Sequence, residues 1–264
     1  MTRAERLRYL LEEINNKKTK PLLNVWIELF EVSNIFEVYD RLLYVKKEID
    51  AFDIEIKLLK FDNNEDFKNI IITLNSIVGF ASLSSPLSNQ NFLETIRMGK
   101  IFSAFNMFQT MEQANHIFPE KEEDIPIDEF ISFKENIEKI ISEIEASNIL
   151  EADKLIFLSI FHDLNKGISL YKINGLNAFY EVLRDNICKI KMISDIDEKN
   201  EENNKFKLLT KKMINKVWIW SITYANKKTQ GLLDSKITKY LDEWAGEESP
   251  NNNSNDIEDT EIEE

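Results

Sequence analysis

Apolar side chains recur every three or four residues along most of this chain, and that spacing places them on one face of an α-helix. The longest run covers residues 35–59 and predicts a helix of about seven turns. Shorter runs predict the other helices. The other predicted helices cover residues 2–16, 21–30, 65–85, 90–117, 126–146, 150–164, 176–190 and 205–224, with a short one at 234–244.

Two of these helices begin with a capping sequence. Thr2 is followed three residues later by Glu5, and Asn34 is followed in the same way by Glu37. In this arrangement the side chain of the first residue accepts a hydrogen bond from a backbone N–H that the helix leaves unpaired. We therefore expect the two helices to start at these residues.

Turns and loops are predicted where glycine and polar residues gather. Gly167 and Gly175 predict a turn region after the helix at 150–164, and the polar run at 194–204 predicts a loop. The segment at 217–224, VWIWSITY, also fits a β-strand, because its β-branched and aromatic residues alternate. We expect it to be helical and buried, since no other segment offers it a strand to pair with.

Glycine and proline are scarce, at six and five residues in 264. Sandwiches, barrels and doubly wound α/β folds need many turn positions that these two residues normally supply, whereas helices need few. Hydrophobic residues make up 43% of the chain, which is enough to build a core and excludes disorder of the whole chain. The sequence therefore predicts an all-α protein, an irregular bundle of about nine helices.

An acidic connector at residues 120–126, EKEEDIP, predicts a division of the chain. The helices before it form an N-terminal part at residues 1–118, and those after it form a C-terminal part at residues 126–245. A single continuous core is the alternative. Residues 246–264 are mostly Asn, Glu and Asp with almost nothing to bury, so we expect a disordered acidic tail.

The negative charge of the chain is concentrated in that tail. Residues 241–264 hold ten acidic side chains and no basic one, and so contribute −10 to a net charge of −14. Residues 119–154 are also acidic, with twelve acids against four lysines. By contrast, residues 205–228 hold seven lysines and no acid, so that the chain ahead of its tail is polarised.

The basic segment at 205–228 is the first candidate site. Lysines interleaved with aromatic side chains are the mixture that binds nucleic acid or another anionic surface. The candidate binding residues are Lys205, Lys207, Lys211, Lys212, Lys216, Trp218, Trp220, Lys227 and Lys228. In the alternative interpretation the lysines only face water and the tryptophans belong to the core. The acidic tail either screens this segment until a partner competes or only keeps the chain soluble.

A second candidate site lies at 158–167, LSIFHDLNKG, where an apolar helix ends in His162 and Asp163. This string resembles the His-Asp step of the HD-domain metal-dependent phosphohydrolases, an all-helical family. The resemblance covers about ten residues and implies that His162 and Asp163 bind a divalent metal ion, with His116 as an earlier ligand. An acid such as Asp185 or Asp195 would be the last ligand. The alternative is that His162 and Asp163 occupy the polar end of a buried helix.

Other enzyme chemistry has no signature in the sequence. The chain has two histidines, no Gly-rich phosphate loop and no Gly-x-Ser-x-Gly elbow. We therefore expect a non-enzymatic interaction or regulatory protein without a cofactor, whose partner is another protein. A metal-dependent phosphohydrolase and a nucleic-acid binder are the alternatives. The single Cys188, with no signal-peptide pattern and no long uncharged apolar run, predicts a cytoplasmic protein without a membrane span.

Overall fold

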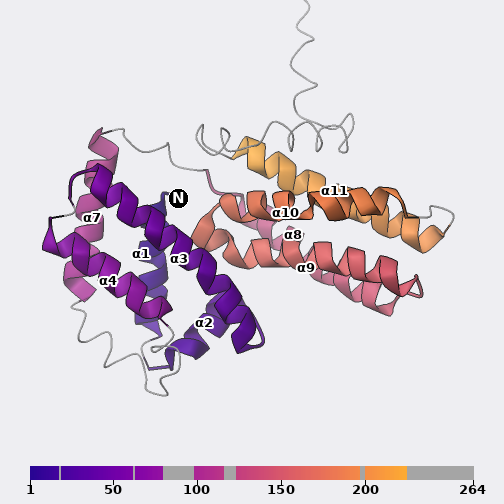
Figure 1. Cartoon of the computed structure of the whole chain (residues 1–264), viewed down its shortest axis with the longest axis horizontal. Coiled ribbons are helices and arrows are strands. Elements are labelled where there is room, and N and C mark those ends of the chain that lie inside the picture. The colour runs from indigo at the N-terminus through magenta and orange to yellow at the C-terminus, as the bar shows by residue number, and fades with distance from the viewer. Residues whose placement is uncertain (18, 62, 80–97, 116–122, 197–199, 225–264) are drawn as a thin grey trace, which may run out of the picture. The chain divides into compact units, whose positions relative to one another are not determined.

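The computed structural model describes residues 1–17, 19–61, 63–79, 98–115, 123–196 and 200–224. Within these ranges the chain forms nine helices and no β-strand. Figure 1 labels these helices on the ribbon. The predicted all-α fold of about nine helices is therefore confirmed. None of the helices in the described ranges is long and apolar enough to cross a membrane. The predicted helix at 234–244 and the predicted disordered tail lie outside the described residues.

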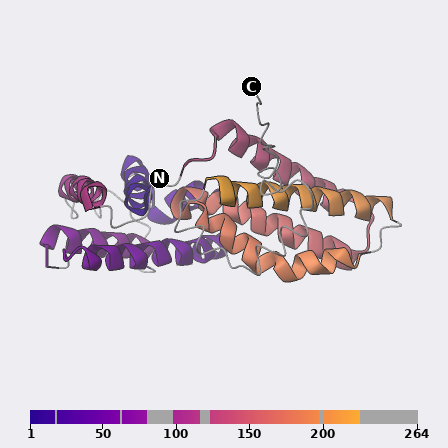
Figure 2. The ribbon, with the colours of Figure 1, turned by 90° about the horizontal axis from the view of Figure 1, so that it is seen from above.

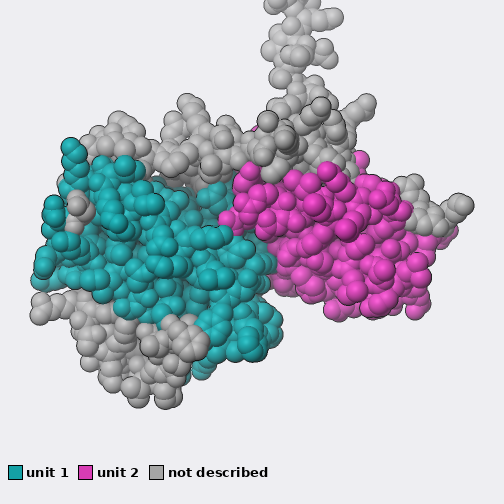
Figure 3. Space-filling view, in the orientation of Figure 1, with its two compact units in different colours: residues 1–124, 166–178 teal, residues 125–165, 179–264 magenta. Residues whose placement is uncertain are grey.

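The chain divides into two compact units, and neither is a single stretch of sequence. Unit 1 comprises residues 1–124 and 166–178, and unit 2 comprises residues 125–165 and 179–264 (Figure 3). The first break follows Asp124, inside the acidic connector at which the sequence predicts a division. The sequence contains no signal that assigns residues 166–178 to unit 1.

In the described residues, unit 1 is built from five helices and the last turns of a sixth. They are α1 Arg3–Asn16, α2 Leu22–Phe30, α3 Ile35–Leu58, α4 Glu65–Val78, α7 Met98–Asn115 and the end of α9 Glu151–Asn174. Their apolar faces meet in one core, as the periodicity predicts. Within it, Phe52 of α3 stacks on Phe105 at 5.6 Å between ring centroids and meets Phe108 edge-on at 4.8 Å.

Both predicted capping sequences are present at the starts of their helices. Thr2 Oγ1 accepts a hydrogen bond from the backbone N–H of Glu5 at 3.3 Å, and the Glu5 carboxylate accepts one from the N–H of Thr2 at 2.9 Å. At α3, Asn34 Oδ1 accepts a hydrogen bond from the N–H of Glu37 at 3.0 Å. These bonds satisfy backbone donors that have no partner inside the helix, and so they define where α1 and α3 begin.

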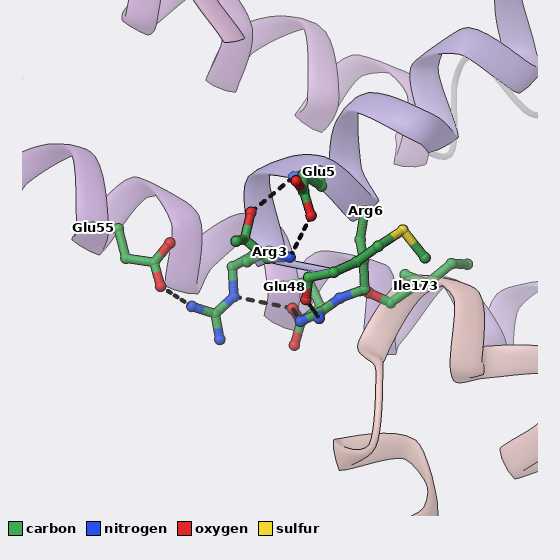
Figure 4. Close-up of polar contacts among 8 residues, drawn as sticks. Arg3, Glu5, Arg6, Glu48, Glu55 and Ile173 are labelled. Atoms are coloured by element: carbon green, nitrogen blue, oxygen red, sulfur yellow. Dashed lines mark hydrogen bonds and ion pairs between the residues drawn. The ribbon is translucent and has the colours of Figure 1, made fainter. Parts of the chain in front are cut away.

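A buried cluster of charged side chains joins α1 to α3 (Figure 4). Arg3 donates to Glu48 at 3.0 Å and also to Glu55, and Arg6 lies 3.4 Å from the same oxygen of Glu48. Burial by itself lowers the pKa of Arg3, but the two glutamates outweigh burial and the pKa is raised. Arg6, Glu48 and Glu55 are buried and Arg3 is half-buried. Buried charged groups are stable only when they are paired, so these four side chains depend on one another.

The described part of unit 2 contains α8 Ile127–Ala146, the first turns of α9, α10 Asn177–Ser194 and α11 Glu201–Thr223. Figures 1 and 2 show these helices side by side. Phe133 of α8, Phe179 of α10 and Trp220 of α11 form an aromatic cluster with ring centroids 4.7, 5.8 and 6.4 Å apart. Because the three rings come from three helices, their contacts stabilise the packing of the unit.

The end of α9 differs from the prediction. The predicted turn at Gly167 is wrong, since α9 continues through it to Asn174. A glycine inside a helix costs only about 1 kcal/mol, and burial of Leu170 and Ile173 in the core of unit 1 outweighs that cost. Gly175 does follow the end of α9, and its φ of 59° is left-handed, which glycine adopts without steric strain.

The start of α11 also differs from the prediction, while its helical character is confirmed. The predicted loop at 194–204 is too long by four residues, because α11 already begins at Glu201. Asn200 Oδ1 accepts hydrogen bonds from the N–H groups of Glu202 and Asn203 at 2.9 and 3.2 Å, which is an N-cap. The segment that also fitted a strand is helical, lying in α11 up to Thr223.

Candidate interaction surface on unit 2

The two tryptophans of α11 lie about 200° apart around the helix, yet both are part of the core of unit 2. Trp218 and Trp220 are both buried. The indole N–H of Trp220 donates to Glu129 Oε2 of α8 at 3.0 Å, and its ring packs edge-on against Phe133. Neither indole presents a face on which a base can stack, so the aromatic residues of the predicted binding segment are part of the core.

The exposed side of α11 carries lysines around one apolar side chain. Lys205, Leu208, Lys212 and Lys216 follow one another at steps of three or four residues, and so they lie on one stripe of the helix. Lys205 and Lys212 are exposed, Lys216 is half-buried, and Leu208 is 60% exposed. These four residues are called the α11 face below.

Lys216 marks the border between this face and the core. Its Nζ atom lies 5.1 Å from the centroid of the Trp220 ring, which is the geometry of a cation–π contact. The contact restricts the side chain of Lys216, so that Lys205 and Lys212 are the more accessible charges of the face.

A carboxylate of α8 already binds one lysine of the α11 face. Lys205 Nζ donates to Glu143 Oε2 at 2.7 Å, and Lys139 lies 3.9 Å from the other oxygen of Glu143. The hydrogen bond from Lys205 lowers the pKa of Glu143. An ion pair on the surface contributes little to stability, so an acidic partner can compete with Glu143 for Lys205.

The other predicted lysines do not join this face. Lys207 Nζ donates to the backbone carbonyl of Ser194, the last residue of α10, at 3.3 Å, where the helix dipole favours a cation. Lys211 is half-buried and stands four residues after Lys207, on the same side of α11. Lys227 and Lys228 lie outside the described residues. The five described lysines are thus divided between two sides of the helix.

The second candidate site lies in the middle of α9, and not at a helix end as the sequence predicted. His162 is exposed, and Asp163 accepts a hydrogen bond from Lys189 Nζ of α10 at 2.5 Å. His116 lies outside the described residues. Among the residues that are described, no group of three or more His, Cys, Asp and Glu side chains is placed to hold a metal ion. The phosphohydrolase interpretation stays a prediction.

Two residues of this surface are missing from the sequence prediction. Glu143 is 62 positions away from Lys205, and only the packing of α8 against α11 brings them together, so no local signal predicts the pair. Leu208 is different, because its place three residues after Lys205 and four before Lys212 can be read from the sequence. An apolar residue at helical spacing inside a basic stripe is the signal that would have found it.

Comparisons of the chain with models of protein families, with curated protein sequences and with solved structures find no match. Function is therefore inferred from the geometry of the described residues.

Proposed function

We propose that this chain is a non-enzymatic interaction protein that binds a macromolecular partner through the α11 face. The supporting observation is the 60% exposure of Leu208 between two exposed lysines. Exposure of a leucine side chain to water costs free energy, and a partner that covers it recovers up to about 1.5–3 kcal/mol. The lysines around Leu208 favour a partner that has acidic side chains at the edge of the contact.

An acidic, amphipathic protein segment is the partner that fits this face. Its carboxylates would pair with Lys205 and Lys212, and an apolar side chain between them would cover Leu208. Nucleic acid fits less well, because its phosphate backbone has no apolar group for the leucine and the two indoles that would stack on bases are buried.

Selection of peptides from a randomised helical display library against the full chain tests this proposal. We expect the enriched peptides to carry acidic and large apolar side chains at steps of three or four residues. In fluorescence anisotropy, Leu208→Ala and Lys212→Glu should each weaken binding of a selected peptide about tenfold. Lys68→Glu makes the same charge change at an exposed site on α4, in unit 1, and should leave binding unchanged.

Two results contradict the proposal. Equal weakening by Lys68→Glu and Lys212→Glu would mean that the peptides respond only to the charge of the whole chain. Binding of single-stranded nucleic acid that falls steeply with salt and is unaffected by Leu208→Ala would favour the nucleic-acid alternative.

The acidic residues 246–264 give our proposal a regulatory part. They lie outside the described residues, and the support for their role is their charge, which is opposite to that of the α11 face. Tethered to the same chain, they compete with an acidic partner at a high effective concentration. A chain that ends at residue 245 should bind the selected peptide more tightly at low salt, and unchanged binding would leave these residues only a solubilising role.

The cytoplasm is the location that we propose for this protein. The single cysteine, Cys188, is a free and exposed thiol, which is the state favoured in a reducing compartment. Cell fractionation with an antibody against the chain tests this location.

A further inference from the structure

α3 carries two apolar stripes, and only one of them belongs to the core of unit 1. The buried stripe consists of Val38, Leu42, Val45, Ile49, Phe52 and Ile56. Four large apolar side chains on α3 are instead open to solvent: Phe36 is 80% exposed, Leu43 64%, Ile54 57% and Leu58 63%. These four residues are called the outer stripe below.

Three of the four residues of the outer stripe share one direction from the helix axis, and Leu58, four residues after Ile54, lies about 40° away. Each residue of an α-helix advances by about 100°, so Phe36, Leu43 and Ile54, at intervals of seven and eleven residues, lie within about 20° of one another. Val45 of the buried stripe comes nine residues after Phe36 and therefore points to the opposite side. Phe36, Leu43 and Ile54 are therefore three apolar positions on one solvent-facing side of α3, at which another helix could make apolar contacts.

Charged residues fill the gaps of the outer stripe at the same spacing. Steps of four and three residues alternate along the series Phe36, Asp40, Leu43, Lys47, Asp50, Ile54 and Lys57. This alternation is the spacing of the a and d positions of a coiled coil, with Asp40, Lys47 and Ile54 at a and Phe36, Leu43, Asp50 and Lys57 at d. Three of the seven positions are apolar and four are charged, so a partner helix would need both apolar side chains and charges opposite to these.

We propose that the solvent side of α3 pairs with α3 of a second copy of this chain, as an antiparallel two-stranded coiled coil. In an antiparallel pair each a residue faces a d residue of the other helix, and a two-fold axis makes every contact occur twice. With this axis at the middle of the seam, Leu43 faces Ile54 of the second copy and Lys47 faces Asp50 of the second copy.

The charges of the seam select this register. Asp40 also faces Lys57 of the second copy, so each of these layers is either apolar or a pair of opposite charges. If one helix were shifted by one heptad along the other, Lys47 would face Lys57 of the second copy. A shift by one heptad in the opposite direction would make Asp40 face Asp50 of the second copy. A parallel pair in register would place each charge against its own copy. One register of the antiparallel pair brings opposite charges together, and the other arrangements bring like charges together. A second copy of the chain is therefore the partner that fits the solvent side of α3.

The charged residues of the seam already have partners within one copy, and they remain accessible. Asp40 accepts from Lys166 at 2.6 Å, and nearly half of its side chain is still exposed. Asp50 and Lys57 each form an ion pair within α3 while more than half of each side chain is exposed. Carboxylates and ammonium groups form several hydrogen bonds each, so contacts across the seam add to the existing ones.

Sedimentation of the full chain over a range of concentrations tests whether it pairs. We expect a monomer–dimer equilibrium whose dissociation constant rises at least about tenfold in Leu43→Glu, because the substitution is present twice in the seam. Ile72→Glu on α4 replaces a similarly exposed apolar side chain away from the seam and should leave the equilibrium unchanged. The double variant Leu43→Glu, Ile54→Lys should restore the dimer through opposite charges.

Disulfide cross-linking tests the register. In chains with Cys188→Ser, copies that carry Leu43→Cys should form a disulfide with copies that carry Ile54→Cys. Two copies that both carry Leu43→Cys should not cross-link, because these positions would be eleven residues, or about 16 Å, apart along the paired helices.

A chain that stays monomeric at high micromolar concentration overturns this proposal. So does a dimer that Leu43→Glu and Ile72→Glu affect equally, or one that cross-links through Leu43→Cys alone. Circular dichroism of each variant checks that it is folded, which we expect because every replaced side chain is exposed. The outer stripe belongs to unit 1, so these results are independent of peptide binding by the α11 face.

Discussion

Arg6 donates a hydrogen bond through Nε to the backbone carbonyl of Ile173 at 2.8 Å, although the two residues are 167 positions apart in the chain. Ile173 lies in the last turn of α9, where the backbone carbonyl groups receive no hydrogen bond from within the helix. The same guanidinium donates to the carbonyl of Met1 at 3.0 Å and contacts Glu48. One buried side chain thus connects the end of α9 to α1 and α3 within unit 1.

Arg6→Leu should lower the free energy of unfolding by about 3 kcal/mol, because it removes a cation from buried Glu48 and the donor from the carbonyl of Ile173. Urea denaturation followed by circular dichroism measures the change. Arg8→Leu, on the same helix, removes a partly exposed ion pair with Glu12 and an exposed hydrogen bond to Asn106, and should cost less than about 1 kcal/mol. Equal losses in the two variants would contradict the role assigned to Arg6.

Two glycines should respond to alanine with opposite signs. Gly175→Ala should lower the free energy of unfolding by about 1 kcal/mol, because its φ of 59° is unfavourable for a residue with a Cβ atom. Gly99→Ala, in α7, should raise it by up to about 1 kcal/mol, since the added methyl group meets nothing within 4 Å. Thermal unfolding of both variants shows the signs, and stabilisation by Gly175→Ala would mean that α9 does not need its left-handed residue.

The pKa of Glu143 should rise in Lys205→Met. The hydrogen bond from Lys205 lowers this pKa, so its loss returns the carboxyl toward the ordinary value for glutamate. In the unsubstituted chain the pair is fully present above the ordinary glutamate pKa and is lost as pH falls through the lowered one. NMR titration of the Glu143 carboxyl carbon measures the shift, and Lys68→Met should leave it unchanged. An identical pKa in both variants would show that Lys205 does not bind Glu143 in solution.

Trp220→Ala should destabilise unit 2 by about 3–5 kcal/mol, because it removes a ring that packs against Phe133 and Phe179. Trp220→Phe keeps most of this packing and loses the hydrogen bond to Glu129, at a cost of about 1 kcal/mol. Lys212→Ala should change stability by less than about 0.5 kcal/mol. If Trp220→Ala is as stable as Lys212→Ala, the indole is on the surface and a stacking role becomes possible again.

The starts of α1 and α3 could be predicted from the sequence, whereas the start of α11 and the end of α9 were predicted wrongly. The side chains of Thr2 and Asn34 accept hydrogen bonds from N–H groups in the first turn of their helices. The residues that determine these two starts are therefore neighbours in the chain. The residues next to Gly167 and Gly175 do not show which of the two glycines ends the helix. What separates them is that the turn after Gly167 packs into the core of unit 1, which no neighbouring residue encodes.

The candidate surface was predictable in its residue types and in part of its arrangement. A count of charges places all the lysines of residues 205–228 in one group, whereas the helix sends Lys205 and Lys212 to one side and Lys207 to another. Helical spacing alone would have made that separation. The contact of Lys205 with Glu143 depends on how two distant helices pack, and so it had no signal in the sequence.

The interrupted chain path of unit 1 has a consequence for its synthesis. Leu170, Ile173 and Ala178 belong to its core, yet they follow residues 125–165 of unit 2 in the chain. A ribosome therefore releases the last core residues of unit 1 only after α8 and the first turns of α9 have emerged. Until then the core is incomplete and its apolar surface is exposed, so unit 1 cannot finish folding ahead of the first helices of unit 2. We expect this apolar surface of the nascent chain to stay open to aggregation until residues 166–178 have emerged.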